Sequence, residues 1–140
     1  MITNQKRVAA ASLVVSAATL VGIALNEGYR DDAYKDAVGV ETIGFGETHG
    51  VEPGQTTTVE RSLATLLAST DAHAKAMIDC IHVPISQNEF DAYVDFTYNV
   101  GVGAFCNSTL NQKLNLGQYE AACKELLRWD YAGEIGRAHV

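Results

Sequence analysis

The longest apolar stretch of the chain lies near its start. An uncharged run of 18 residues extends from Val8 to Leu25, and Lys6 and Arg7 precede it. As a helix it would be about 27 Å long at ~1.5 Å per residue, close to the ~30 Å of a bilayer core. Ten of the 18 residues are Ala, Ser, Thr or Gly, so the run is weakly apolar. The pattern predicts an N-terminal apolar helix.

Four interpretations of this run are open on its pattern alone. The first is a cleaved signal peptide, with Gly22-Ile23-Ala24 as a small-x-small site. The others are a permanent membrane anchor, a signal-anchor-release segment and a buried core helix. For the first three, the two positive charges favour a cytoplasmic N-terminus and an exported remainder. The many small residues favour release, because each exposes little apolar area to water.

Short β-favouring runs follow between residues 31 and 46. They are Val38–Val40 and Thr42–Phe45, and glycines interrupt them. This pattern predicts a small antiparallel hairpin with Gly39 at or near its turn. Residues 47–55 contain Gly and Pro breakers and are predicted to form a loop.

Helical periodicity dominates the rest of the chain. Thr57-x-x-Glu60 and Ser86-x-x-Glu89 are capping boxes, which mark helix N-termini. Apolar residues at helical spacing follow each box: Val59, Leu63, Leu66, Leu67, Met77 and Ile78, then Phe90, Tyr93, Val94 and Tyr98. Shorter helices are predicted near Thr109–Leu116 and Tyr119–Trp129. The aromatic residues fit a core, except Phe105, which follows Gly101 and Gly103 on a predicted loop and is expected at a cleft.

Composition and charge narrow the possible functions. A chain of 140 residues corresponds to one domain, and 47% hydrophobic residues with two prolines suit a folded core rather than disorder. The net charge of −7 leaves no basic patch to meet phosphates, which argues against nucleic-acid binding.

Three residues between the apolar run and the predicted hairpin carry candidate chemistry. Eight residues separate Glu27 from Asp36, and five separate Asp36 from Thr42. Hydrolysis of a glycosidic bond needs a proton for the leaving oxygen, an activated water, and a negative charge near the developing cation. Two carboxylates can divide these roles if their environments separate their pKa values. Surface acids around a turn are the alternative explanation of the same spacing.

The residues around this triple resemble the phage lysozymes of the T4 type. The resemblance rests on three blocks that occur in the family's order: Glu27 to Gly46 with Tyr34-Lys35-Asp36 and Thr42-Ile43-Gly44-Phe45-Gly46; Val83 to Ala92 followed by Phe96 to Gly101; and Ser108 to Leu110 followed by Leu127 to Gly133. It covers most of the chain. One departure is Glu47, where many members have His.

The resemblance implies an α+β, lysozyme-like fold, in which a small β lobe and a helical lobe from about Thr57 flank a cleft. It implies a phage endolysin that hydrolyses the β-1,4 bond between N-acetylmuramic acid and N-acetylglucosamine of peptidoglycan for host lysis. Glu27 would be the acid, and Asp36 with Thr42 would activate water in an inverting mechanism. Gly44, Phe45 and Phe105 are expected to bind the glycan. We expect a monomer without metal or cofactor.

Two other functions stay open beside this one. The chain could be a defective prophage product that at most binds wall glycan, or a membrane-tethered interaction protein whose lysozyme-like residues serve only the fold. The intact triple favours the enzyme. Asp31, Asp32 and Glu41 add negative charge near Glu27 in sequence, and like charges would raise the pKa of its carboxyl.

The resemblance also bears on the N-terminal run. In the family, the catalytic Glu ends the first helix of the soluble fold, and cleavage after Ala24 would leave only Leu25 and Asn26 before Glu27. This favours an uncleaved signal-anchor-release segment, residues 8–25, whose last turns become that helix. The expected location is the host inner membrane first and the periplasm after release.

The chain has three cysteines, which an exported protein would oxidise where they can pair. Cys80 and Cys106 lie just before and just after the second long helix, so they could form a disulfide if the chain doubles back. Cys123 would then be a free thiol. A metal site made of Cys80, His82 and His73 fits no common zinc spacing.

The end of the chain departs from the family. The resemblance stops at Gly133, and Ile135 to Val140 resembles the translation of a sequencing adapter. We therefore expect three segments: a signal segment at 1–25, a catalytic domain at 26–133 that lacks its C-terminal part, and a non-native tail at 134–140. Such a chain would leave apolar residues near Leu127 and Trp129 uncovered and would be aggregation-prone or only partly folded. The alternative is a natural short variant with an exposed tail.

Overall fold

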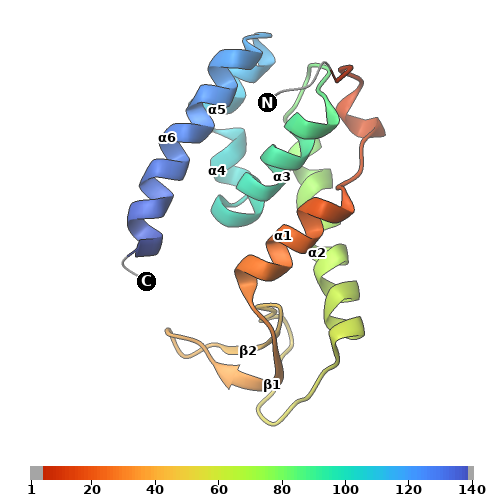
Figure 1. Ribbon diagram of the computed structural model, residues 1–140, viewed down its shortest axis with the longest axis vertical. Helices are drawn as coiled ribbons and strands as arrows, with labels where there is room; N and C mark the ends of the chain where they lie inside the picture. Colours follow the sequence, from red (N-terminus) through yellow and green to blue (C-terminus); the bar gives the residue numbers. More distant parts are fainter. Residues whose placement is uncertain (1–4, 139–140) are drawn as a thin grey trace. The chain divides into compact units, whose positions relative to one another are not determined.

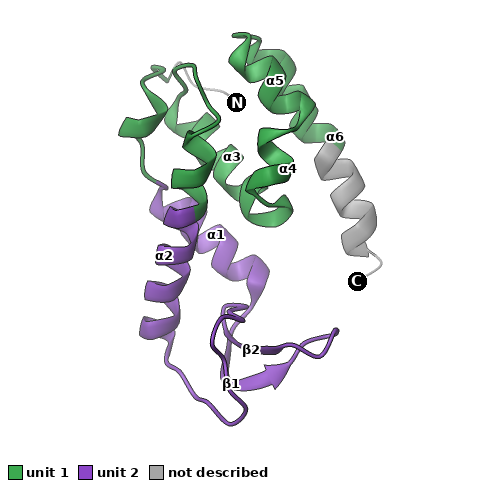
Figure 2. Cartoon of the chain, turned by 180° about the vertical axis from the view of Figure 1, so that it is seen from behind, with its two compact units in different colours: residues 1–14, 73–140 green, residues 15–72 purple. Residues whose placement is uncertain are grey.

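The computed structural model describes the backbone of residues 5–138 and side chains as far as Arg128. The chain forms two compact units (Figure 2). Unit 2 is residues 15–72, and unit 1 combines residues 1–14 with residues 73–140. Unit 1 therefore joins the start of the chain to its second half. The family fold expected from the sequence, helices with a small antiparallel sheet, is what the structure contains.

Unit 2 contains α1 (Ala17–Glu27), β1 (Arg30–Lys35), β2 (Glu41–Gly44) and most of α2 (Val59–Ile78) (Figure 1). The two strands form an antiparallel hairpin in which Tyr34 lies opposite Thr42. Gly39 lies in the connecting turn with φ of 83°, a conformation that favours glycine. The predicted hairpin and its turn residue are confirmed.

The predicted N-terminal apolar helix is wrong as a single element. Residues Val8 to Leu25 divide into a short 3₁₀ helix, η1 (Ala10–Ser12), an extended link, and α1. Ser12 Oγ donates to the carbonyl of Ala9 (2.7 Å), and Ser16 Oγ accepts from the N–H of Thr19 (3.2 Å) and caps α1. Serine side chains that bond the nearby backbone compete with a continuous helix. No helix among the described residues is long and apolar enough to span a bilayer.

The start of the chain is attached to unit 1. The backbones of Val8 and Ile85 exchange two hydrogen bonds of 2.9 and 2.8 Å. Arg7 donates to both carboxylate oxygens of Glu89 at 3.0 and 2.8 Å, and its guanidinium lies 3.6 Å from the ring centre of Tyr119. The residues before α1 are thus built into the fold.

Helix α2 begins one residue later than the capping box at Thr57 suggests. The helix starts at Val59, and the N–H of Arg61 donates to Thr58 Oγ1 (3.3 Å), so Thr58 is its cap. Of the apolar positions predicted to face the core, Leu66 and Met77 are buried, whereas Leu63 and Leu67 are exposed along with Val59.

Unit 1 is a set of helices around aromatic side chains. They are α3 (Gln87–Val100), α4 (Val102–Cys106), α5 (Thr109–Asn115) and α6 (Tyr119–Ala138) (Figure 1). The predicted capping box at the start of α3 is confirmed: the Ser86 side chain accepts from the N–H of Glu89, and the Glu89 side chain accepts from the N–H of Ser86. Gly117 has φ of 76° in the link before α6, the position expected for it between two helices.

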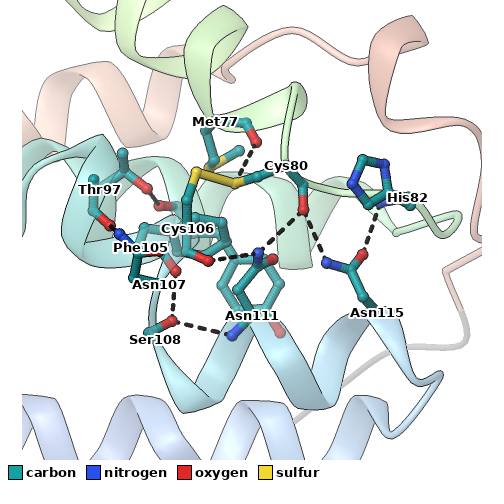
Figure 3. The surroundings of a disulfide bond; sticks show 12 residues. Met77, Cys80, His82, Thr97, Phe105, Cys106, Asn107, Ser108, Asn111 and Asn115 are labelled. Carbon is teal, nitrogen blue, oxygen red and sulfur yellow. Dashed lines mark hydrogen bonds between the residues drawn. A yellow bond between two sulfur atoms is a disulfide. The ribbon is translucent and has the colours of Figure 1, made fainter.

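A disulfide ties the end of α2 to α4. Cys80 and Cys106 are bonded, with their Cα atoms 5.7 Å apart, so the expected pair is confirmed. Asn111 Nδ2 donates to the carbonyls of both cysteines at 3.1 and 3.2 Å (Figure 3). Asn115 Nδ2 donates to the carbonyl of Cys80 at 2.9 Å. Two asparagines of α5 therefore hold the backbone on both sides of the bond.

Some of the expectations for the C-terminus concern described residues, and others do not. Leu127 is 67% exposed, and Cys123 is an exposed free thiol. The side chains of Trp129 and Tyr131, and residues 139–140, lie outside the described residues. The boundaries proposed at residues 25 and 133 stay predictions.

Candidate active site

Glu27 is the last residue of α1. Gly28, with φ of 74°, ends the helix, and its N–H donates to the carbonyl of Ala24 at 3.1 Å. The end of the apolar run therefore forms the helix that carries this carboxyl. This is the arrangement expected if the run is retained in the folded protein.

The carboxyl of Glu27 lies against the backbone of Gly46. Much of the residue is exposed, but a Cβ atom placed on Gly46 would be 2.6 Å from Glu27 Oε2. Burial of the carboxyl raises its pKa above the ordinary value. The pKa of Glu27 is shifted upward, as expected from the sequence, but the cause of the shift is burial and not the like charges of neighbouring acids. A raised pKa keeps a proton available for donation.

Asp36 occupies the turn between β1 and β2. Its Oδ1 accepts hydrogen bonds from the N–H groups of Val38 and Val40, each at 2.9 Å. Its own carbonyl accepts from the N–H of Gly39 at 3.0 Å. A side chain that bonds the backbone two residues on is a common device of tight turns. The turn fixes the direction of the carboxylate by local bonds.

Thr42 is buried on β2, at 4% exposure, and its Oγ1 donates to the carbonyl of Val40 at 2.9 Å. Asp36 accepts from the N–H of the same Val40. One residue therefore anchors both candidate groups at the same end of the hairpin. All three catalytic candidates belong to unit 2.

The expected glycan-binding residues have different surroundings. Gly44 is buried, with φ of 64°, and a Cβ there would be 2.5 Å from Ser62 Oγ. This gives Gly44 a packing role, and its part in glycan binding stays a prediction. Phe45 is half-buried and pairs with Tyr29, their ring centres 5.0 Å apart. Sequence reasoning missed Tyr29, although an aromatic residue two places after Glu27 was a signal.

Phe105 does not fit its expected place. It lies in α4 rather than on a loop, it is fully buried, and it contacts Tyr93 and Phe96 with ring centres 5.8 and 6.2 Å apart. The two glycines suggested a loop, but Gly101 ends α3 and Gly103 lies inside α4. A side chain without exposed surface offers a sugar no contact, so Phe105 is a core residue.

The alternative metal site loses its central ligand, because Cys80 is in the disulfide. His73 stacks on Tyr98 with ring centres 5.1 Å apart. Glu47, which replaces the family's histidine, exchanges backbone hydrogen bonds of 2.9 Å with Ile43 and closes the turn after β2. The departure at this position leaves the hairpin and the catalytic candidates in place.

Comparison with known proteins now decides the family. The phage lysozyme family model matches residues 24–138. This chain belongs to the phage lysozyme family. The endolysin of Acyrthosiphon pisum secondary endosymbiont phage 1 is 37% identical over 124 residues, which cover 88% of this chain and 84% of that protein.

Two further matches extend the comparison. The SAR-endolysin of Bacteriophage PS119 is 41% identical over 108 residues, covering 76% of this chain and 65% of that protein. The solved endolysin from Escherichia coli O157:H7 phage FAHEc1 matches with a TM-score of 0.76 and 36% identity, over 84% of this chain and 76% of that one. The predicted fold class and enzyme class are confirmed at the level of the family. The family match ends at residue 138, beyond the point where the motif resemblance stops.

Proposed function

We propose that this phage lysozyme cleaves the β-1,4 bond between N-acetylmuramic acid and N-acetylglucosamine in peptidoglycan. The observation that carries the proposal is the contrast between two carboxyls of one unit. Glu27 is partly buried and its pKa is raised, whereas Asp36 accepts two backbone N–H groups in a turn. Different environments assign different roles to two carboxyls.

In this mechanism Glu27 donates its proton to the glycosidic oxygen as the bond to the anomeric carbon breaks. Asp36 accepts a proton from the water that attacks the opposite face of the sugar. Thr42 helps to orient that water, with its hydroxyl held by the carbonyl of Val40. Such a displacement inverts the anomeric centre and needs carboxyls about 6.5–9.5 Å apart to admit the water.

Digestion of purified peptidoglycan tests the proposal. After borohydride reduction, the new reducing ends should be muramitol, and proton NMR during digestion should show the inverted anomer first. Glu27→Gln and Asp36→Asn should each lower the rate of turbidity loss by roughly 10²–10⁴-fold, the usual contribution of a general acid or base, with little change in melting temperature. Glu52→Gln and Asp32→Asn, which alter exposed acids of the same unit, are the matched controls. Glucosaminitol as the reduced end, or full activity in either catalytic variant, would disprove the assignment.

We also propose that residues 8–25 tether the enzyme to the inner membrane before release to the periplasm. Lys6 and Arg7 before the run support this, as does the similarity to proteins named SAR-endolysins. In the folded form Val8 bonds Ile85 and Arg7 bonds Glu89. The same residues would therefore act first in the membrane-tethered state and then in the released, folded state.

Cell fractionation tests the tether. Full-length protein should appear in the membrane fraction and move to the periplasm at unchanged mass when the membrane potential is collapsed. Replacing Ala17 and Gly22 with Leu should hold it in the membrane. A shorter soluble product that begins near Leu25 would show cleavage instead.

A further inference from the structure

Residues 44–46, at the end of β2 and in the turn that follows it, contact other parts of unit 2 at three points. Two backbone hydrogen bonds of 2.9 Å between Ile43 and Glu47 close the turn. Both of its glycines have positive φ, 64° at Gly44 and 81° at Gly46. The backbone between them carries Phe45. The turn is therefore tight, and its two glycines bring main-chain atoms near other elements.

Each residue of the turn meets a different neighbour. Gly44 lies against Ser62 of α2, and the ring of Phe45 contacts the ring of Tyr29 at a tilt of 49°. Gly46 lies against the carboxyl of Glu27, where an added Cβ would be 2.6 Å from Oε2 and 3.5 Å from Cδ. Real Cβ atoms do not approach oxygen this closely, so a side chain at Gly46 and the present position of the carboxyl exclude each other.

We propose that Gly46 is a positioning residue for the acid: its bare backbone leaves the space in which the Glu27 carboxyl rests, partly shielded from water. The proposal rests on the function assigned to Glu27 above. The clash would fall on the far end of a flexible side chain, so a methyl group at Gly46 moves the carboxyl and not the backbone. Misplacing a reacting group by about 1 Å can cost a hundredfold in rate.

The variant Gly46→Ala tests this, and Gly54→Ala is its matched control. Gly54 belongs to the same unit and has φ of 82°, against 81° for Gly46, but a Cβ there meets nothing within 4 Å. Both variants therefore place an alanine at nearly the same positive φ, and only one obstructs the carboxyl. We expect losses in melting temperature of similar size, a kcat about a hundredfold lower for Gly46→Ala alone, and a KM close to that of the parent for both.

A second readout needs no activity. NMR titration of the Glu27 side-chain carbon should show its pKa falling toward the ordinary value in Gly46→Ala and staying raised in Gly54→Ala. Burial is the cause of the raised pKa of Glu27, so a change in this pKa reports directly on the burial of the carboxyl. An unmoved or higher pKa, an unchanged kcat, or a much larger loss of stability than in Gly54→Ala would each overturn the proposal. If Glu27→Gln stays active, the proposed function fails, while the titration still decides whether Gly46 places the carboxyl.

Discussion

The two units of this lysozyme hold their important side chains by different means. Unit 2 carries Glu27, Asp36 and Thr42 and fixes them with short-range backbone hydrogen bonds and glycine turns. Its hairpin exposes apolar residues, with Val38 82% and Val40 42% exposed. Unit 1 contains the fully buried aromatic core and the disulfide. If the proposed site is right, the difference means that catalysis depends on local geometry in one unit and stability on burial in the other.

The largest test of this comparison is in the core of unit 1. Phe105→Ala removes a fully buried ring and should lower the free energy of unfolding by about 3–5 kcal/mol. Because Phe105 has no exposed surface, KM for peptidoglycan in the folded protein should not change. Urea denaturation and steady-state kinetics at low temperature measure the two quantities. A KM that rises severalfold in folded protein would restore the glycan-binding role expected from the sequence.

The disulfide gives the next effect. The double variant Cys80→Ser with Cys106→Ser should lose about 2–4 kcal/mol of unfolding free energy, because the bond closes a loop of sequence separation 26. The kcat of the folded protein should stay within about twofold, since the proposed catalytic residues lie in the other unit. Cys123→Ser, at an exposed free thiol, is the control and should leave the melting temperature unchanged. A large fall in kcat would show that the units are not separable in this way.

Arg7 provides a smaller test at the start of the chain. Arg7→Gln leaves the half-buried carboxylate of Glu89 without its ion-pair partner, with the N–H of Ser86 still bonded to it, and should cost roughly 1 kcal/mol after discounting for the exposure of Arg7. Burial raises the pKa of Glu89, but the hydrogen bonds and charge of Arg7 together with the backbone of Ser86 outweigh it and hold that pKa below its usual value. The stability that Arg7 supplies is therefore present above the unfolded pKa and disappears as pH falls through the folded pKa. Thermal melts at neutral pH and near pH 3 measure it.

The exposed pair of Lys124 and Glu120, at 3.7 Å, serves as the control for Arg7. Lys124→Gln should change stability by less than about 0.5 kcal/mol. Equal costs for Arg7→Gln and Lys124→Gln would show that the contact between the N-terminal residues and α3 does not stabilise unit 1.

The smallest effect concerns pH in unit 2. The pKa of Glu27 is raised by burial, so its carboxyl loses its proton at a higher pH than an ordinary glutamate, whose pKa is about 4.3. The alkaline limb of kcat/KM against pH should therefore lie above that value. Amide variants of Asp31, Asp32 and Glu41 should not move the limb. A shift to lower pH in these variants would show that charge contributes after all.

The same raised pKa has a consequence for stability. The folded state binds the proton of Glu27 more tightly than the unfolded state, so the ionised carboxylate opposes folding as pH rises above the unfolded pKa. Glu27→Gln should therefore melt at the same temperature as the parent or slightly higher at neutral pH. A lower melting temperature would indicate that the charged carboxylate has a stabilising partner.

Features formed within a few residues were predictable from the sequence. The capping box of Ser86 and Glu89, the Gly39 turn and the hairpin all use hydrogen bonds between near neighbours. The spacing of Glu27, Asp36 and Thr42 indicated the family, and the comparisons confirmed it. The pair of Cys80 and Cys106 was expected only on the condition that the chain between them doubles back, and the disulfide confirms it.

Features that depend on distant residues were decided by the tertiary structure. The apolar run looked like one helix, but its first residue, Val8, bonds Ile85, and Arg7 just before it bonds Glu89, both far along the chain. Phe105 followed two glycines, yet the aromatic rings of α3 bury it. The contact of Gly46 with Glu27 and the burial that raises the pKa of the acid join α1 to the turn after β2. Local hydrogen bonds form between neighbours in the sequence and can be predicted from it. Burial depends on which elements pack together, and the spacing of residues along the chain does not reveal which elements these are.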